Sequence, residues 1–316
     1  MSSTPPPFSD PAALPIRVAA LYRFARLEDL PALQQDILAI CRRNGIVGTL
    51  LLAFEGINGT IAGQPDKLDE ALDQICRRSG LGDLELKFSG AASLPFRRLK
   101  VKVKREIVTM AKPDLDPRLS AGTYVSPGEW NALISDPETI VIDTRNDYEV
   151  RLGTFAGAVD PNTTTFSEFP AWVEAHREDL AGRKIAMFCT GGIRCEKATA
   201  YVREAGFESV FHLKGGILQY LEDVPADRSL WQGECFVFDD RVAVGHGLSL
   251  GAAQLCHACR HPVTEADRAD PRYVEGVCCP QCAETQDPAD RARFAERQKQ
   301  IELAAERCQS HLRSPS

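Results

Sequence analysis

Residues 184–206, KIAMFCTGGIRCEKATAYVREAG, decide the fold of the central part of the chain. An apolar run typical of a buried parallel strand ends at Cys189, and two glycines follow it. A helical pattern then begins near Cys195 and stops at Gly206, a residue type that often ends helices. This strand, loop and helix order predicts that Cys189 lies at the carboxyl edge of a sheet, where open α/β folds hold their sites.

The loop between strand and helix, called here the cradle loop, favours an anion on sulfur. Its glycines let backbone N–H groups turn inward, the following helix adds its positive end, and Arg194 adds a fixed cation. We therefore expect a lowered pKa and a nucleophilic thiolate at Cys189. A glycine-rich turn around an inert buried cysteine is the alternative, but a turn alone requires neither Cys189 nor Arg194. The members of the cradle loop are Cys189, Thr190, Gly191, Gly192, Ile193 and Arg194.

Alternating strand and helix patterns continue on both sides of this loop. Apolar runs at 139–145 and 210–213 predict further parallel strands, so residues 129–228 form a doubly wound α/β domain. Residues 16–112 follow a β-α-β-β-α-β order, which fits a ferredoxin-like α+β sandwich. The expected N-terminal elements are strands at 18–24, 46–54, 84–88 and 99–108, a short strand after a tight turn at 55–59, and helices at 30–43 and 65–78. Asn58 is interpreted as turn chemistry.

The run RLKVKVKR at 98–105 alternates cations with apolar residues. As a strand it would carry its cations on one face, where each could neutralise a phosphate of an RNA backbone. The alternative is a solvated strand edge protected by lysines. The candidate RNA-binding residues are Arg97, Arg98, Lys100, Lys102, Lys104 and Arg105.

Residues 229–316 form a cysteine-rich region that ends in a charged helix near 288–307. Two Cys-x2-Cys pairs, separated by nineteen residues, have the spacing of a structural four-cysteine zinc site. The expected ligands are Cys256, Cys259, Cys279 and Cys282, with Cys278, His257 and His261 as alternatives.

The overall composition is that of an ordinary globular protein. The 316 residues are 44% hydrophobic and 26% charged, with a net charge of −7, which does not exclude a polyanionic partner. Residues 1–15, with five prolines, are expected to be a disordered tail, and 113–128 a linker. No secretory leader or membrane span is visible, so we expect a cytoplasmic protein without a membrane partner, whose cysteines are metal ligands or reactive thiols.

The cradle loop, with VIDTRNDYEVRLGTFAGA at 141–158 and HLKGGI at 212–217, resembles the rhodanese domain. The resemblance implies a cysteine persulfide at Cys189. In that pattern Asp143, Arg145 and Glu149 are expected to be structural salt-bridge residues. Phosphatases of related fold use a loop one residue longer, so the Cys-x4-Arg spacing argues against phosphatase activity.

CTGGIRCEKA at 189–198, EGIN at 55–58, REIV at 105–108 and the cysteine-rich tail together resemble the bacterial rhodanese-domain tRNA uridine(34) hydroxylases. The resemblance implies oxygen-dependent conversion of the wobble uridine to 5-hydroxyuridine, with tRNA as partner, dioxygen as co-substrate and Cys189 required. The electron donor stays unidentified. A plain sulfurtransferase that carries a Cys189 persulfide is the alternative function, and a non-catalytic RNA-binding module is a third.

Two chemical roles for Cys189 are consistent with hydroxylation. A thiolate adding to uracil C6 would make C5 an enolate carbon able to attack an oxygen electrophile, with Arg194 and loop N–H groups stabilising the negative charge. A persulfide acting as reductant or nucleophile is the competing version. Cys195 either resolves an oxidised Cys189 as a disulfide or simply packs at the helix start.

Overall fold

The computed structural model describes residues 14–306, which form two compact units. The first runs to Cys235 and includes Gly245–Ser249, and the second comprises Phe236–Val244 and the chain from Leu250. The predicted tail at 1–15 lies outside the described residues except for Leu14 and Pro15.

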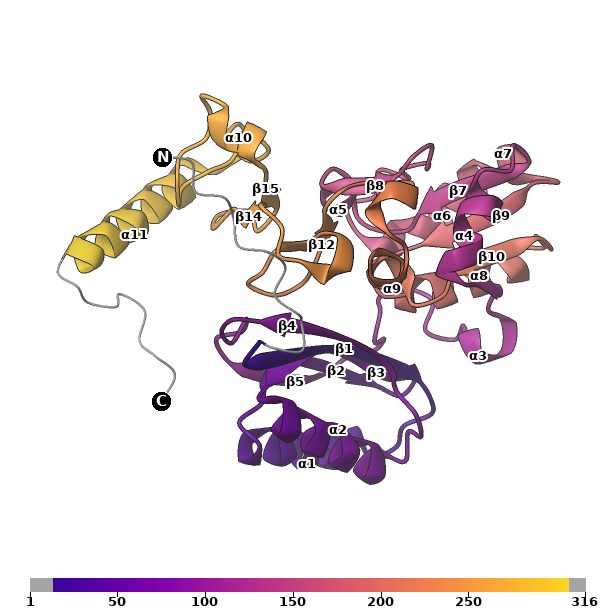
Figure 1. The fold of residues 1–316 in the computed structure, drawn as a ribbon, viewed down its shortest axis with the longest axis horizontal. Coiled ribbons are helices and arrows are strands. Elements are labelled where there is room, and N and C mark those ends of the chain that lie inside the picture. Colours follow the sequence, from indigo (N-terminus) through magenta and orange to yellow (C-terminus); the bar gives the residue numbers. More distant parts are fainter. Residues whose placement is uncertain (1–13, 307–316) are drawn as a thin grey trace. The chain divides into compact units, whose positions relative to one another are not determined.

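The N-terminal part of the first unit is a sheet covered on one face by α1 and α2 (Figure 1). Its strand order, β4-β1-β3-β2-β5, contains the predicted ferredoxin-like arrangement with β5 added parallel to β2 at one edge. The bounds are β1 Ile16–Phe24, α1 Leu30–Arg43, β2 Val47–Ala53, β3 Gly56–Gly63, α2 Pro65–Ser79, β4 Glu85–Ala91 and β5 Leu99–Val103.

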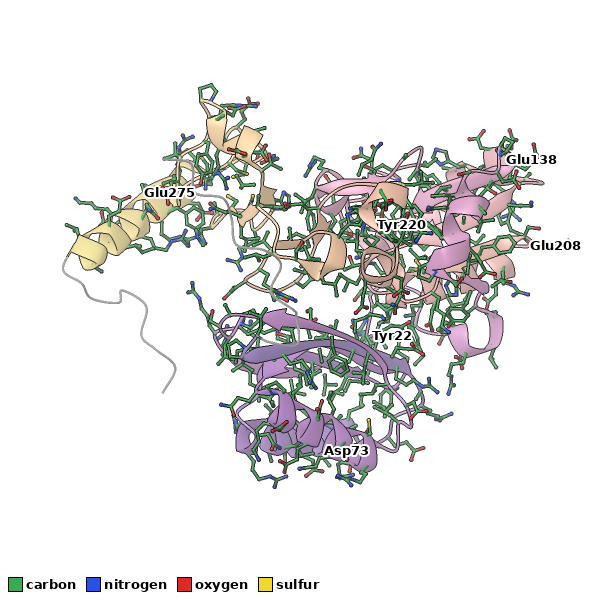
Figure 2. The ribbon with its side chains drawn as sticks, viewed as in Figure 1. Tyr22, Asp73, Glu138, Glu208, Tyr220 and Glu275 are labelled. Carbon is green, nitrogen blue, oxygen red and sulfur yellow. The ribbon has the colours of Figure 1, made fainter. Side chains whose placement is uncertain are left out.

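Period-2 alternation along β1 divides its side chains between the two faces of the sheet. Ala19 and Leu21 join the core between the sheet and the helices, and Figure 2 labels the exposed Asp73 on one of these helices, α2. Tyr22 and Phe24 form a separate cluster with Ala53 and Ile107, against which Ile193 of the cradle loop also packs. The sheet face opposite the helices is therefore where this domain meets the central one.

Two expectations in this domain are wrong. The predicted strand at 99–108 ends at Val103, which is 41% exposed, so Lys104 and Arg105 lie beyond the strand. The EGING segment is not a turn after Glu55, because Gly56 begins β3. Asn58 pairs with Tyr22 and Leu51 within the sheet, and its side-chain amide donates to the Ile107 carbonyl at 2.8 Å.

The central part of the first unit is a parallel sheet in the order β6-β10-β9-β7, which confirms the predicted doubly wound class. Helix α8 (Ile193–Glu204) begins two residues before the predicted start, so Arg194 lies in its first turn. Part of the expected linker at 113–128 is folded, since α3 (Pro117–Ser120) and the sheet strand β6 (Thr123–Val125) lie in it. The remaining elements are α4 Pro127–Ile134, β7 Thr139–Asp143, α5 Asp147–Val150, β8 Gly153–Phe155, η2 Phe166–Glu168, α6 Phe169–Ala175, α7 Arg177–Leu180, β9 Lys184–Phe188, β10 Val210–Leu213, α9 Gly216–Asp223, η3 Ala226–Arg228, β11 Trp231–Gly233 and η4 His246–Leu248.

The second unit has little regular structure apart from its last helix. Its two short strands β14 and β15 pair antiparallel beside the cysteine pairs. The elements of this region are β12 Cys235–Phe236, β13 Ala243–Val244, β14 Gln254–Leu255, β15 Pro262–Val263, α10 Glu265–Ala269 and α11 Pro288–Glu306. Within residues 14–306, every helix is too short or too polar to cross a bilayer.

Candidate active site

The cradle loop connects β9 to α8 and encloses the Cys189 sulfur. The backbone N–H of Gly192 donates to Cys189 Sγ at 3.2 Å, and Gly192 adopts φ of 100°, a conformation that is strained for any residue with a side chain. Cys189 is completely buried, although it lies at the carboxyl edge of the sheet as expected.

The surroundings of Cys189 favour the thiolate. Burial by itself would raise the pKa of the thiol, but the Cys195 thiol, the Arg194 charge and the N–H groups of Cys195 and Gly192 together lower it to about 6. The neighbouring Cys195 behaves oppositely, since burial and the Cys189 charge raise its pKa. Cys195 is thus a thiol that donates to a thiolate, and its sulfur also lies 3.5 Å from Thr144 Oγ1.

Arg194 is held by an acidic partner. Its guanidinium makes a bidentate pair with Glu149 at 2.7 and 2.8 Å, and it also donates to Thr190 Oγ1 at 3.3 Å. Burial alone would raise the pKa of Glu149, yet the Arg194 charge lowers it, so the pair stays ionised. The pair holds the Arg194 guanidinium in one position within the cradle loop.

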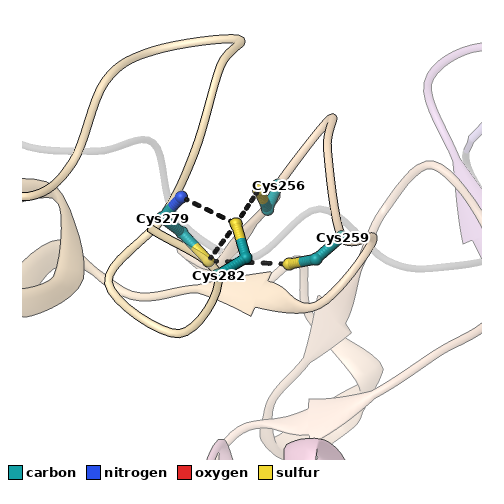
Figure 3. A group of neighbouring side chains, drawn as sticks. All are labelled: Cys256, Cys259, Cys279 and Cys282. Atoms are coloured by element: carbon teal, nitrogen blue, oxygen red, sulfur yellow. Dashed lines mark hydrogen bonds between the residues drawn. The ribbon is translucent and has the colours of Figure 1, made fainter. Parts of the chain in front are cut away.

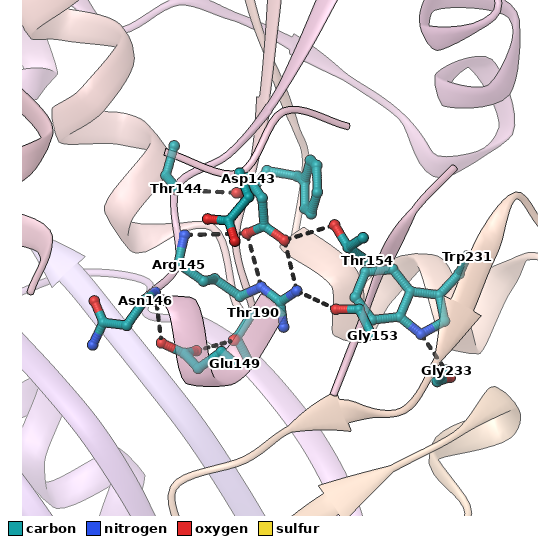
Figure 4. Close-up of polar contacts among 12 residues, drawn as sticks. Asp143, Thr144, Arg145, Asn146, Glu149, Gly153, Thr154, Thr190, Trp231 and Gly233 are labelled. Atoms are coloured by element: carbon teal, nitrogen blue, oxygen red, sulfur yellow. Dashed lines mark hydrogen bonds and ion pairs between the residues drawn. The ribbon is translucent and has the colours of Figure 1, made fainter. Parts of the chain in front are cut away.

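A second buried ion pair supports the neighbouring loop (Figure 4). Asp143 and Arg145 are both fully buried and bond through two parallel contacts of 2.9 and 2.7 Å. Thr154 Oγ1 donates to Asp143 at 2.9 Å, and Arg145 donates to the Gly153 carbonyl. These contacts tie the end of β7 to β8, which is the structural arrangement expected for this pair.

The Gly-Gly turn of HLKGGI packs directly against the cradle loop. A Cβ on Gly216 would stand 2.6 Å from the carbonyl oxygens of Cys189 and Thr190, so only glycine fits there. The N–H groups of Ile217 and Leu218, at the start of α9, donate to these same two carbonyls at 2.9 and 3.1 Å. The start of α9 therefore binds these two carbonyls, while the N–H of Gly192 donates to the sulfur.

The residues after the cradle loop contact the N-terminal domain, which sequence reasoning missed. Lys197 is fully buried and its ammonium lies 2.6 Å from Glu106 and 2.8 Å from Glu55. Glu55 also accepts from the Ile107 N–H at 2.6 Å. The EGIN, REIV and CTGGIRCEKA segments thus meet in one contact, which we call the Lys197 junction (Lys197, Glu55 and Glu106).

A second contact between the domains involves Glu196. Tyr22, labelled in Figure 2, donates its hydroxyl to Glu196 at 2.7 Å. The Tyr124 hydroxyl also bonds Glu196, and the Tyr124 ring lies 4.1 Å from that of His212. Tyr22 is 174 residues from Glu196 in the sequence, so local patterns could not predict their contact. The sequence offered one signal, two adjacent charged residues, Glu196 and Lys197, at the start of a helix.

The predicted basic residues lie on and around β5, at the sheet edge away from β4. Lys102 and Lys104 are exposed, while Lys100 is half-buried. The chain continues from Arg105 directly into Glu106 of the Lys197 junction. The exposed members of the predicted set are Arg97, Arg98, Lys102, Lys104 and Arg105.

The four expected cysteine ligands come together in the second unit (Figure 3). All four sulfur atoms lie within 4.8 Å of one another. Cys278 is not part of this group, since its thiol donates to the Arg272 carbonyl at 3.4 Å. Four thiolates at this spacing fit a tetrahedral metal ion with no open position, so the cluster can hold a structural metal. Its members are Cys256, Cys259, Cys279 and Cys282.

Comparisons with known proteins agree with both folds. Family models match the UPF0176 acylphosphatase like domain over residues 16–107 and the rhodanese-like domain over 126–223. A Mesorhizobium japonicum protein named tRNA uridine(34) hydroxylase is 64% identical over 93% of this chain and 95% of its own. A Brucella anthropi protein of the same name is 58% identical over 92% and 95%. A solved human single-domain sulfurtransferase matches 34% of this chain and 100% of its own at 24% identity, with a TM-score of 0.28.

The fold and the cradle loop define a rhodanese-domain protein extended by an acylphosphatase-like domain and a cysteine cluster. The identity over nearly the full length narrows the class further. The chain belongs to the tRNA uridine(34) hydroxylase family.

Proposed function

We propose that the protein hydroxylates C5 of the wobble uridine in tRNA, with Cys189 as its nucleophile. The observation that carries this proposal is the intact cradle loop, with the Cys189 pKa lowered to about 6, in a chain 64% identical to a protein named tRNA uridine(34) hydroxylase. A cytoplasmic location follows from the tRNA substrate.

The chemistry begins with the thiolate. Cys189 adds to C6 of the uracil, which places an enolate electron pair at C5, and C5 takes an oxygen atom derived from dioxygen. The second oxygen atom is reduced to water by two electrons from an external reductant. The Arg194 charge and the Gly192 N–H stabilise the negative charge that moves between sulfur and the ring.

Cys195 is proposed to keep Cys189 reactive in two ways. Its thiol donates to the Cys189 thiolate in the resting protein. If Cys189 is oxidised to a sulfenic acid, Cys195 is close enough to condense with it into a disulfide that a thiol reductant reopens.

Binding of tRNA is proposed to use the exposed cations around β5, and the four-cysteine cluster is proposed to hold structural zinc. Exposed cations alone do not show which polyanion binds. The support is that this basic segment runs into the Lys197 junction, which adjoins the helix that begins in the cradle loop.

The test is a nucleoside analysis of tRNA incubated with the purified protein, a reductant and air. We expect 5-hydroxyuridine with the wild-type protein, and none without dioxygen or with Cys189→Ser. The wobble nucleoside is also compared in tRNA from strains with and without the gene. Equal hydroxylation in both strains, in an organism with no redundant pathway, would contradict the proposed function.

The sulfurtransferase alternative is examined with thiosulfate and cyanide in the same preparation. The N–H groups and the Arg194 charge of the cradle loop favour an anionic persulfide as well as a thiolate, so thiocyanate formation without any 5-hydroxyuridine would favour sulfur transfer. Substitution of 5-fluorouridine at the target separates the two roles of Cys189. A Cys189-dependent covalent adduct supports addition to C6, and its absence beside normal hydroxylation supports the persulfide.

A further inference from the structure

Glu196 is a buried carboxylate whose partners are hydroxyl groups. It is 9% exposed, accepts from Tyr22 Oη at 2.7 Å and also bonds the Tyr124 hydroxyl. The other buried carboxylates near the cradle loop, Asp143 and Glu149, each have an arginine as partner. A carboxylate held by hydroxyls alone is not locked in its ionised form.

The Tyr22–Glu196 pair stands against the wall of the cradle loop. The Tyr22 hydroxyl is 3.1 Å from the place where a Cβ on Gly192 would stand, and the Gly192 N–H contacts Cys189 Sγ. The Glu196 N–H in turn bonds the Gly192 carbonyl at 3.3 Å. The negative charge of Cys189 acts on Glu196, so the two acidic groups are electrostatic neighbours.

The charges around Glu196 set its proton affinity. Burial raises the pKa of Glu196, the hydroxyls of Tyr22 and Tyr124 lower it, and the charges of Glu85 and Cys189 raise it, with an increase as the result. Arg23 on β1 acts on Tyr124 rather than on Glu196 directly. Glu196 is therefore a stronger proton acceptor than an ordinary glutamate.

Four other ionisable groups around the cradle loop are poor bases near neutral pH. Glu149 is bound to Arg194, and burial raises the pKa values of Cys195 and Tyr22. Burial lowers the pKa of His212 to about 4, and its ring packs 4.1 Å from the Tyr124 ring. Among these described groups, Glu196 is the one suited to accept a proton from a substrate bound at Cys189.

Hydroxylation through a C6 adduct requires such a base. Once C5 carries the new hydroxyl, it still bears its hydrogen, and sulfur is still bonded to C6. We propose that Glu196 takes this hydrogen as a proton: the C5–H pair becomes the C5–C6 double bond, the C6–S bond breaks, and its pair returns to Cys189 as thiolate. No oxidant is needed in this elimination. The step rests on the proposed function, because it presupposes the adduct.

The variant that tests this step is Glu196→Gln, which keeps the shape and an acceptor for the two tyrosines. In single-turnover reactions with tRNA deuterated at C5 of the target uridine, we expect a rate loss of about 100-fold or more. The deuterium isotope effect should increase, and the Cys189–tRNA adduct should accumulate on denaturing gels. In the pH–rate profile of adduct breakdown the acid limb of the wild type should disappear, whereas adduct formation should keep the acid limb that the Cys189 thiol sets.

Glu85→Gln is the matched control, because Glu85 is an exposed carboxylate close enough for its charge to raise the pKa of Glu196. It should leave adduct turnover and the isotope effect nearly unchanged. If Glu196→Gln misfolds, Glu196→Asp provides the readout: a working base with a different pKa should move the acid limb of the pH profile.

Wild-type turnover in Glu196→Gln, or a slower reaction with no adduct and no change in the isotope effect, would overturn the role of Glu196. The latter result would show that the residue only positions the two domains. Failure of the proposed function looks different, since the wild-type protein itself would then form no Cys189-dependent adduct with 5-fluorouridine tRNA.

Discussion

At the scale of single residues, the cradle loop is a balance between burial and hydrogen bonding. Burial opposes the Cys189 thiolate, and the donors supplied by Cys195 and Gly192 together with the Arg194 charge outweigh it. Burial and the Cys189 charge also act on Cys195, and they outweigh the opposing contributions of Thr144 and Arg194, so one thiol is activated and its neighbour is kept protonated.

This balance predicts the titration of Cys189. The thiolate absorbance near 240 nm, taken as the difference between wild type and Cys189→Ser, should rise with a midpoint near pH 6, because the thiol with its lowered pKa is ionised above that pH. In Arg194→Gln the midpoint should move upward by about 1–3 units, since the cation that favours the thiolate is gone. Arg151→Gln, which removes an exposed arginine on α5's C-terminal side, should leave it in place. Equal midpoints in all three proteins would contradict the assigned role of Arg194.

At the scale of elements, the fold of the second unit brings two distant cysteine pairs together and leaves out a neighbouring cysteine. Cys278 and Cys279 are adjacent, yet their side chains point to different partners, a carbonyl and the cluster. Sequence spacing did not decide between them, because zinc-ligand pairs occur with two to four intervening residues, and two and three residues separate Cys279 and Cys278, respectively, from Cys282.

Metal analysis of the purified protein should therefore find one zinc ion per chain. Cys279→Ser should lose most of it, since three thiolates hold zinc less tightly than four, and Cys278→Ser should retain it. The metal is quantified by mass spectrometry after dialysis against a weak chelator. Zinc loss in both variants alike would show that the ligand set is different.

The exposed cations on and just after β5 make a separate prediction about RNA. Replacing Lys102 and Lys104 with alanine should weaken tRNA binding and reduce the slope of log affinity against log salt by about 0.7–0.9 for each phosphate that is no longer neutralised. Replacement of Lys67 and Arg77, exposed cations on α2, is the matched control. Filter binding over a salt series measures both. An unchanged slope in the β5 variant would favour the alternative of a strand edge protected by lysines.

Much of the element structure could be predicted from local patterns. Apolar runs indicated the parallel strands β7, β9 and β10, and the glycines of the cradle loop indicated a site at the sheet edge. The end of β5 at Val103 was not visible, because the alternation of cations and valines continues past the last pairing with β2. Asn58 was interpreted as a turn residue because glycines stand on both sides of it in the sequence. It lies instead in β3, which pairs with β1 and β2.

At the scale of the whole first unit, contacts between segments far apart in the sequence could not be predicted. Tyr22 and Glu196 are 174 residues apart, and Lys197 and Glu106 are 91 apart. No periodicity within either domain encodes these pairings, since each side chain satisfies its local pattern without them. The partners of Glu196 and Lys197 therefore emerged only from the folded chain.

The Lys197 junction should contribute strongly to stability. Lys197→Met leaves the carboxylates of Glu55 and Glu106 without their cation, which we expect to cost about 3–5 kcal/mol in the free energy of unfolding. Lys67→Met removes an exposed pair and should cost less than about 1 kcal/mol. Urea unfolding at constant zinc content, followed by fluorescence, measures both changes.

The pH dependence of that difference has a defined sign. Burial favours the protonated form of Glu106, but Lys197 outweighs it and lowers its pKa in the folded protein. Its contribution is complete above the ordinary glutamate pKa and is lost as pH falls through the lowered value. The gap between wild type and Lys197→Met should therefore narrow in acid, and a gap that widens there would contradict the ion pairing.

The Lys197 junction also changes what a family signature means. The three short motifs EGIN, REIV and CTGGIRCEKA are far apart in the sequence, but each contributes one residue to a single contact between the two domains. Because CTGGIRCEKA holds both Cys189 and Lys197, a profile built on the three motifs combines a signal for the catalytic loop with a signal for the contact between domains. A search for family members that have lost catalysis should therefore score the cradle loop and the Lys197 junction separately.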